Sequence, residues 1–277
     1  MTDLHMHTTA SDGRCTPTEL VDRVVAAGIT VMAVTDHDTT AAVADVQSHA
    51  RARGIEAHAG IEITAVEDGR DIHMLGYFLN PAEPRLIEFL RVQRDTRVKR
   101  VQAIAARLAE LGVPIDLQAL LDKAERNVGR SIGRPQVARA LQHAGHVADT
   151  KEAFDRFLSS DGPAFVSRPG SSPEVVIGII HRAGGLASLA HPGRTRIDSR
   201  IKPLSLAGLD AIEVYHSDHD KETVERYHRM ASELGLLMTG GSDFHGDPAH
   251  GIEPGTSTLP AAEWQRLNAA RRRHVVE

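Results

Sequence analysis

The chain has 277 residues, of which 41% are hydrophobic and 25% are charged, and its net charge is −5 with histidine counted as neutral. This composition is typical of a folded globular protein with one large or two ordinary domains, and no apolar run reaches the ~18 residues of a membrane-spanning helix. The acidic balance argues against a general nucleic-acid coat protein, so neither extended DNA binding nor a membrane partner is expected.

Cysteine is rare in this chain and histidine is abundant. The single cysteine, Cys15, excludes an internal disulfide framework and a cysteine-based zinc site, and it favours a reducing compartment. The N-terminus lacks the basic and apolar regions of a secretory signal, so the cytoplasm is the expected location. The 16 histidines outnumber the ten aromatic residues, and histidine is the commonest nitrogen ligand of metals. The composition therefore allows a metal site with nitrogen and oxygen ligands.

Short apolar runs alternate with helical patterns along most of the chain. Strands are expected at Thr2–Met6, Ile29–Thr35, Glu56–Ile63, Ile72–Leu79, Leu186–Ala190, Ala211–Tyr215 and Leu236–Gly240. Helices are expected at Thr16–Ala27, Ala41–Arg53, Pro173–Ala183 and Lys221–Leu234, the first with Thr16 as its N-cap. This alternation predicts an α/β protein with a parallel sheet, either open or closed into a barrel.

The segment 81–168 interrupts this alternation. It shows only helical patterns, at Leu86–Leu111, Leu117–Ala124, Arg134–Ala144 and Lys151–Phe157. We interpret it as a helical insertion or lid domain within an α/β domain formed by 1–80 and 169–277. Between Arg85 and Arg139, twelve Lys or Arg residues stand against six Asp or Glu residues. Solvated helix faces and a lid that binds an anionic substrate both explain this surplus.

Potential metal ligands stand at or near one end of every expected strand. For six strands this is the carboxyl end, where parallel α/β folds carry their active sites, while His73 lies nearer the middle of its strand. In the first strand His5 and His7 alternate with Met6, so both imidazoles face one side. Nine donors are expected to converge: His5, His7, Asp12, His37, Glu62, His73, His191, Asp243 and His245. Such a set suits two or three ions, with Glu62 or Asp243 as a bridge.

Other polar residues beside these donors have open roles. Asp36 and Asp38 are candidates for orienting their neighbours. Glu213 and His216 are candidates for a supporting or acid–base role, and a place in the core or on the surface is equally open.

The order of these motifs resembles that of the PHP (polymerase and histidinol phosphatase) superfamily. The resemblance rests on Asp3-Leu4-His5-Met6-His7-Thr8, Ser11-Asp12-Gly13, Thr35-Asp36-His37-Asp38, Gly60-Ile61-Glu62, His73 with Leu75-Gly76-Tyr77, Ala190-His191-Pro192 and Ser242-Asp243-Phe244-His245. It covers the chain apart from the insertion and implies a distorted (β/α)7 barrel of the PHP type.

The resemblance also implies a trinuclear metal site. His5, His7, Glu62 and Asp243 would hold the first ion, Glu62 with His73 and His191 the second, and Asp12, His37 and His245 the third. Some members have histidine where this chain has Asp12. Because a carboxylate is a harder ligand than imidazole, Asp12 favours Mn²⁺, with Zn²⁺ or Fe²⁺ as alternatives.

The insertion and the segment Arg130-Ser131-Ile132-Gly133-Arg134-Pro135 resemble a stand-alone bacterial branch of this superfamily. Members of that branch act as 3′,5′-nucleoside bisphosphate phosphatases, and some are 5′-3′ exoribonucleases on short RNA. The resemblance implies a small phosphorylated substrate or an RNA 5′ end as the partner. Arg130, Ser131 and Arg134 are then candidates for binding a second phosphate, and ordinary surface residues are the alternative.

The expected reaction is removal of the 3′-phosphate by a hydroxide shared between two ions, which attacks phosphorus in line. His37 or arginines would neutralise the phosphoryl oxygens, and Asp12, His191 and His216 are candidate proton donors to the leaving group.

Four alternatives stay open: a 5′-3′ exoribonuclease, a histidinol-phosphate-type phosphatase, an amidohydrolase that cleaves C–N bonds, and an inactive metal-binding module. Many binuclear amidohydrolases have a carboxylated lysine as the metal bridge near a strand end. None of the five lysines lies at an expected strand end, which favours the phosphoesterase.

Overall fold

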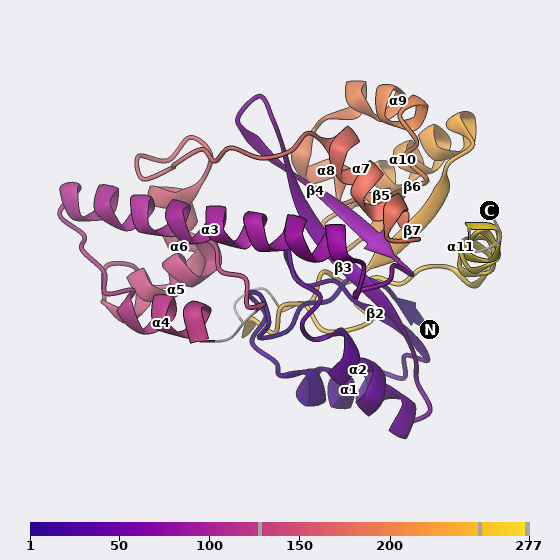
Figure 1. Cartoon of the computed structure of the whole chain (residues 1–277), viewed down its shortest axis with the longest axis horizontal. Helices are drawn as coiled ribbons and strands as arrows, with labels where there is room; N and C mark the ends of the chain where they lie inside the picture. Colours follow the sequence, from indigo (N-terminus) through magenta and orange to yellow (C-terminus); the bar gives the residue numbers. More distant parts are fainter. Residues whose placement is uncertain (127–128, 249–250, 275–277) are drawn as a thin grey trace.

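The computed structural model describes residues 1–126, 129–248 and 251–274 (Figure 1). Seven strands form one sheet in chain order: β1 (Thr2–Asp3), β2 (Val31–Val34), β3 (Glu56–Glu67), β4 (Arg70–Tyr77), β5 (Leu186–Leu189), β6 (Ala211–His216) and β7 (Leu237–Gly241). All seven expected strands are present. β3 continues four residues beyond its expected end, and β1 is shorter than expected.

Contacts between the first and last strands nearly close the sheet into a barrel. The N–H of Leu4 donates to the carbonyl of Gly240 (3.1 Å), and beyond the strand ends Met6 pairs with Phe244 in parallel register. The two segments approach so closely that a Cβ on Gly241 would lie 2.3 Å from the backbone nitrogen of His5. The expected distorted seven-stranded barrel is therefore confirmed.

The direction of β4 differs from the expected parallel sheet. β4 runs antiparallel to both β3 and β5, and the other neighbouring strands are parallel. Only Asp68 and Gly69, both with positive φ, join β3 to β4, which is the geometry of a two-residue hairpin. Parallel pairing needs a crossover connection that so short a loop does not supply. The reversal explains why His73 lies within its strand, opposite Thr64, and not at the carboxyl end.

Helices pack around the barrel (Figure 1). They are α1 (Pro17–Ala26), α2 (Val43–Ala52), α7 (Pro173–Arg182), α8 (Pro192–Thr195), α9 (Asp198–Leu206), α10 (Lys221–Leu234) and α11 (Ala261–His274). Thr16 caps α1 as expected, because its hydroxyl accepts the N–H of Glu19 and the Glu19 carboxylate accepts the N–H of Thr16. The sequence patterns did not indicate α8, α9 or α11; α9 contains Pro203. Among the described residues, no helix is both long and apolar enough to cross a membrane.

Between β4 and α7 the described chain forms helices only. These are α3 (Pro84–Glu110), α4 (Gln118–Arg126), α5 (Arg134–His143), α6 (Thr150–Ala153) and a π-helical turn at Phe154–Leu158. They project from one side of the barrel in Figure 1. The long α3 joins two cores, since Leu86 and Leu90 pack with the barrel side chains while Val101 and Ile104 pack with the other insertion helices. The expected helical content is confirmed, and the division into two domains stays a prediction.

We expect Gly241→Ala to destabilise the closure between β1 and β7. The new Cβ would collide with the His5 backbone, so the two segments would have to separate. Overpacking of this kind costs roughly 1–3 kcal/mol in the free energy of unfolding, measurable by urea denaturation. Gly178→Ala in α7 is the control, because its Cβ would make an ordinary 3.6 Å contact and alanine favours a helix. Equal stability of Gly241→Ala and the wild type would contradict this account.

Candidate metal centre

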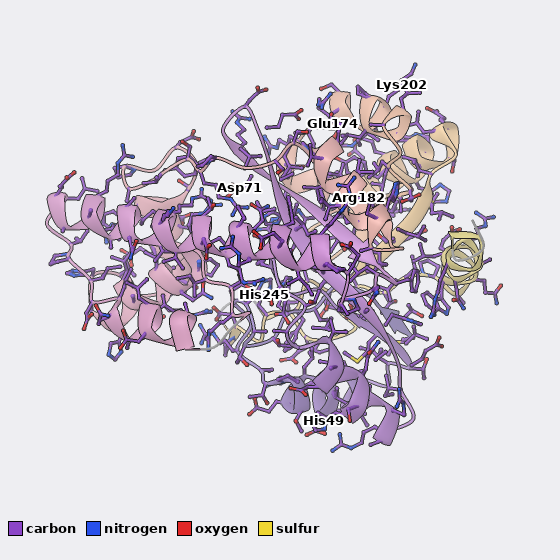
Figure 2. All side chains as sticks on the ribbon, in the orientation of Figure 1. His49, Asp71, Glu174, Arg182, Lys202 and His245 are labelled. Atoms are coloured by element: carbon purple, nitrogen blue, oxygen red, sulfur yellow. The ribbon has the colours of Figure 1, made fainter. Side chains whose placement is uncertain are left out.

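The nine expected donors come together at one end of the barrel. They lie in the segments that follow β1, β2, β5 and β7 or within β3 and β4, and His245 appears near the middle of the view in Figure 2. The set is His5, His7, Asp12, His37, Glu62, His73, His191, Asp243 and His245. His73 and His245 are half-buried and the other seven are buried. Although β4 is reversed, His73 belongs to this group: Nδ1 of His73 lies 2.7 Å from Oε1 of Glu62.

Four of the donors face one point in the barrel. The Nε2 atoms of His5 and His7 each lie 3.2 Å from Oδ1 of Asp243 and 3.3 Å from Oε2 of Glu62. These four atoms are buried, and none has a hydrogen-bond partner among the described residues. Two imidazole nitrogens and two carboxylate oxygens in this arrangement fit a divalent cation.

Glu62 connects this group to a second one. Its Oε2 also lies 3.0 Å from Nδ1 of His37, and its Oε1 lies 2.7 Å from Nδ1 of His73 and 3.0 Å from Nε2 of His191. The two oxygens therefore face different sets of imidazoles. This is the geometry that a carboxylate needs to bridge two ions.

Asp12 is the centre of a third group. Its Oδ1 lies 3.3 Å from Nε2 of His245 and 3.8 Å from Nδ1 of His7, and its Oδ2 lies 3.5 Å from Nε2 of His37. His7 belongs to both the first and the third group, one ring nitrogen facing each. The three groups are thus contiguous.

The loop that carries Asp12 is fixed by Asp36. The Asp36 carboxylate accepts hydrogen bonds from the backbone N–H (2.8 Å) and hydroxyl (2.6 Å) of Thr8 and from the hydroxyl of Ser11 (2.6 Å). The turn also needs Gly13, because a Cβ there would lie 2.5 Å from the His7 carbonyl. Asp36 therefore orients the loop beside the donors, as its place beside His37 suggested.

The carboxylates of the centre are held in their charged form. Burial alone would raise the pKa of Glu62, but the neighbouring imidazoles, those of His37 and His73 foremost, hold it well below its usual range. The pKa of Asp12 and that of Asp243 are lowered in the same way against burial. These three carboxylates are therefore in the anionic form that a metal ligand requires.

The imidazoles differ in protonation. Burial lowers the pKa of His7, but Asp243 and Glu62 outweigh it and raise this pKa to about 10. Burial lowers the pKa of His191 to about 4 although Glu62 is close. With no cation bound, His7 is therefore charged at neutral pH and His191 is neutral.

Arg134, expected to bind substrate, lies in an arginine cluster beside the centre. Its Nη2 is 3.2 Å from Oδ2 of Asp71, and its Nη1 donates to the carbonyl of Leu158. Asp71 also pairs with Arg100 at 2.7 Å, and it stands two residues before His73 on β4. Burial lowers the pKa of Arg134 to about 10, so it stays charged at neutral pH.

Ser131, which follows Arg130 directly, lies against the loop of the third group. The N–H of Ser131 donates to the carbonyl of Ala10 at 2.9 Å. The Ser131 hydroxyl and the Nε of Arg130 are buried without a hydrogen-bond partner in the described part of the chain. This segment of the insertion is therefore next to the loop that carries Asp12, and its role in binding substrate stays a prediction.

Several arginines near the centre were not singled out from the sequence, Arg97, Arg168 and Arg194 among them. Arg97 donates to Oδ2 of Asp38 at 2.5 Å, and Arg168 lies 3.5 Å from the same atom. Arg194 donates to Oδ2 of Asp243 at 3.2 Å and is half exposed. For Arg97 the signal was the basic surplus of the insertion, and for Arg194 its place just after the strand-end His191. Nothing in the sequence patterns pointed to Arg168.

The four residues expected to act in catalysis all lie at the centre. Asp12, His37 and His191 stand within the donor groups, and His216 touches one of them, its Nε2 lying 3.4 Å from Oδ2 of Asp243. Their individual roles stay predictions.

Known proteins resemble this chain over nearly its whole length. The profile of the PHP domain family matches residues 3–233. The 3′,5′-nucleoside bisphosphate phosphatase of Chromobacterium violaceum is 34% identical over 278 residues, which cover 96% of each chain. The 5′-3′ exoribonuclease Rnm of Escherichia coli is 34% identical over 267 residues, covering 94% of this chain and 90% of its own. A solved structure from Bifidobacterium adolescentis, described as a predicted metal-dependent phosphoesterase, has a TM-score of 0.88 at 31% identity and covers 98% of this chain and 96% of its own.

We expect metal binding to release protons even at pH 8. A free imidazole, with a pKa near ~6.5, is already neutral there, but His7 stays protonated until the pH approaches its pKa of about 10. Calorimetric titration with Mn²⁺ in buffers of different ionisation enthalpy gives the number of protons released. His7→Gln should release fewer protons, and the affinity of the wild type should fall as the pH is lowered. Binding without proton release at pH 8 would contradict the raised pKa.

Proposed function

The chain belongs to the PHP domain family and is a metal-dependent phosphoesterase, and on that premise we propose that it removes the 3′-phosphate from 3′,5′-nucleoside bisphosphates. The convergence of nine nitrogen and oxygen donors, Glu62 among them, carries the proposal. The bisphosphate phosphatase of Chromobacterium violaceum supports the choice of substrate, since it is similar over nearly the whole chain. A cytoplasmic location belongs to the proposal as well and rests on the single cysteine.

The donors fit two or three divalent ions. His5, His7, Glu62 and Asp243 would hold the first, Glu62 with His73 and His191 the second, and Asp12, His37 and His245 the third. The mixture of imidazole and carboxylate suits Mn²⁺, with Zn²⁺ or Fe²⁺ as alternatives. When bound, such ions lower the pKa of water towards ~7 and offset charge on the phosphoryl oxygens.

A wall of arginines beside this centre suits a substrate with a second phosphate. The arginine wall consists of Arg97, Arg100, Arg134 and Arg168 from the insertion and its end. These four guanidinium groups share two carboxylates, Asp38 and Asp71, among the described residues. Arg168 is almost fully buried, and its Nη1 has no hydrogen-bond partner there. Because an uncompensated buried charge is costly, the surplus positive charge favours a bound dianion such as phosphate.

The wall is next to the donors. Asp38 follows His37 directly, and Asp71 and His73 are alternate residues of β4, whose side chains face the same side. A phosphate on the wall would thus belong to the molecule whose other phosphate is at the metal centre. Arg130 and Ser131, whose Nε and hydroxyl have no hydrogen-bond partner among the described residues, would extend this subsite towards the Asp12 loop.

A short RNA with a 5′-phosphate is the second candidate substrate. The similarity to the Rnm exoribonuclease of Escherichia coli favours it, and the arginine wall suits its phosphates equally. Histidinol phosphate has a single phosphate and leaves the wall without a partner. The bridging position belongs to Glu62 and not to a lysine, which disfavours the amidohydrolase alternative.

We expect adenosine 3′,5′-bisphosphate to be hydrolysed to adenosine 5′-monophosphate and phosphate in the presence of Mn²⁺. Initial rates with this compound, histidinol phosphate and 5′-phosphorylated oligoribonucleotides, followed by phosphate release and chromatography, rank the candidates. The bisphosphate should have the highest kcat/KM because it alone combines a terminal 3′-phosphate with a phosphate for the wall. A higher kcat/KM for the oligoribonucleotide would favour the exoribonuclease.

We expect Arg134→Ala to raise KM for the bisphosphate about tenfold or more, since it removes one charged phosphate contact. Asp71 keeps its bond to Arg100, so the insertion should stay folded. Turnover of p-nitrophenyl phosphate, which has no second phosphate, should change little. Arg91→Ala is the matched control, because Arg91 lies exposed on α3 and pairs only with Glu88 and Asp95 in the described structure. An unchanged preference for the bisphosphate would exclude a role of Arg134 in binding it.

A further inference from the structure

Two polar side chains of β6, those of Glu213 and His216, both point towards the metal centre although they are three residues apart. In a regular strand Glu213 and His216 would face opposite sides, because side chains alternate. The pairing of β6 with β7 contains a register shift: Glu213 is opposite Thr239, but Tyr215 is opposite the next residue, Gly240. The bulge inserts Val214 as an extra residue, so Glu213 and His216 reach the same end of the barrel interior, and both are buried.

Glu213 supports two donors with its two carboxylate oxygens. Its Oε1 lies 2.8 Å from Nδ1 of His5, the ring nitrogen that faces away from the first donor group. Its Oε2 accepts the backbone N–H of His191 at 2.7 Å. His191 has a φ of 25°, a conformation that non-glycine residues rarely adopt, so this bond also holds a strained backbone.

His216 supports a third donor. Its Nδ1 accepts the backbone N–H of Asp218 at 3.0 Å, so the ring proton belongs on Nε2. Nε2 lies 3.4 Å from Oδ2 of Asp243, while the other oxygen, Oδ1, faces His5 and His7. With both ring nitrogens engaged inside the protein, His216 is poorly placed to give a proton to a leaving group.

We propose that Glu213 and His216 are positioning residues that the β6 bulge places behind the metal centre. Glu213 turns Nε2 of His5 towards the cation position and fixes the His191 backbone, and His216 turns Oδ1 of Asp243 towards the same position. A carboxylate on the far nitrogen of a liganding imidazole fixes its orientation and raises its basicity. The inference rests on the metal centre of the proposed function, but it concerns residues outside the nine donors.

The test measures Mn²⁺ affinity directly, from the electron paramagnetic resonance signal of free Mn²⁺ in titrations of metal-free protein. Glu213→Gln leaves one acceptor oxygen for two hydrogen-bond donors, Nδ1 of His5 and the backbone N–H of His191. It should lower the Mn²⁺ affinity of the tightest site about 10–100-fold. Asp210→Asn is the matched control. Asp210 precedes β6, contacts Nε2 of His181 and accepts the N–H of Ala187, so it makes the same two kinds of contact away from the donors. The Mn²⁺ affinity of Asp210→Asn should stay within about twofold of that of the wild type.

His216→Ala tests the second residue through two readouts. A positioning role predicts weaker Mn²⁺ binding and equal relative losses in turnover of p-nitrophenyl phosphate and the bisphosphate. A proton donor would instead leave Mn²⁺ affinity unchanged and lose more activity on the bisphosphate, whose alkoxide is the poorer leaving group. That second pattern would overturn the role of His216.

Melting curves and circular dichroism check that each variant is folded. If Glu213→Gln does not fold, Glu213→Asp keeps the charge at shorter reach and should weaken Mn²⁺ binding to a smaller degree. Affinity equal to wild type in the folded Glu213 variant would overturn the role of Glu213. Failure of the wild type to bind Mn²⁺, and Zn²⁺ or Fe²⁺ in parallel titrations, would overturn the metal centre itself, which separates the two proposals.

Discussion

The structure depends on one buried carboxylate, that of Glu62, and on the imidazoles that surround it. The five imidazoles around its two oxygens belong to His5, His7, His37, His73 and His191. Burying a carboxylate is costly unless cations or hydrogen-bond donors compensate it. The ends of β1, β2 and β5 and the middle of β4 must therefore meet at this point, and barrel closure and the hairpin into β4 make that possible.

Much of this centre was predictable because its geometry is local. Alternation along the extended segment that follows β1 places His5 and His7 on one side, and parallel strands bring their carboxyl ends together. The reversal of β4 was missed although Asp68-Gly69 is a hairpin signal, because the strand–helix alternation around it favoured parallel pairing. The contacts of Arg168 and the bulge in β6 depend on how distant segments pack, which no local pattern records.

The long helix α3 holds part of the arginine wall in a fixed position relative to the barrel. Its first turns pack in the barrel core and its later turns in the core of the insertion, and Arg97 and Arg100 stand on the stretch between the two. Because Arg97 and Arg100 stand on one continuous helix, the helix fixes their distances from the metal-donor residues, and no loop is needed to place them. Gln93 adds to this fixation, because its amide donates to the carbonyl of Thr64 on β3, and Thr64 also accepts a hydrogen bond from Arg97.

The closure between β1 and β7 also affects when the centre can form. The first donor group combines His5 and His7 with Asp243, so it joins segments that lie far apart in the sequence. During synthesis, the N-terminal histidines emerge long before their partner, and contacts of such large sequence separation form late in folding. A nascent chain that has not reached Asp243 therefore holds an incomplete first group, and metal loading of that group has to follow translation of this segment. Truncation before Asp243 would disable the centre even though most of the donors come earlier in the chain.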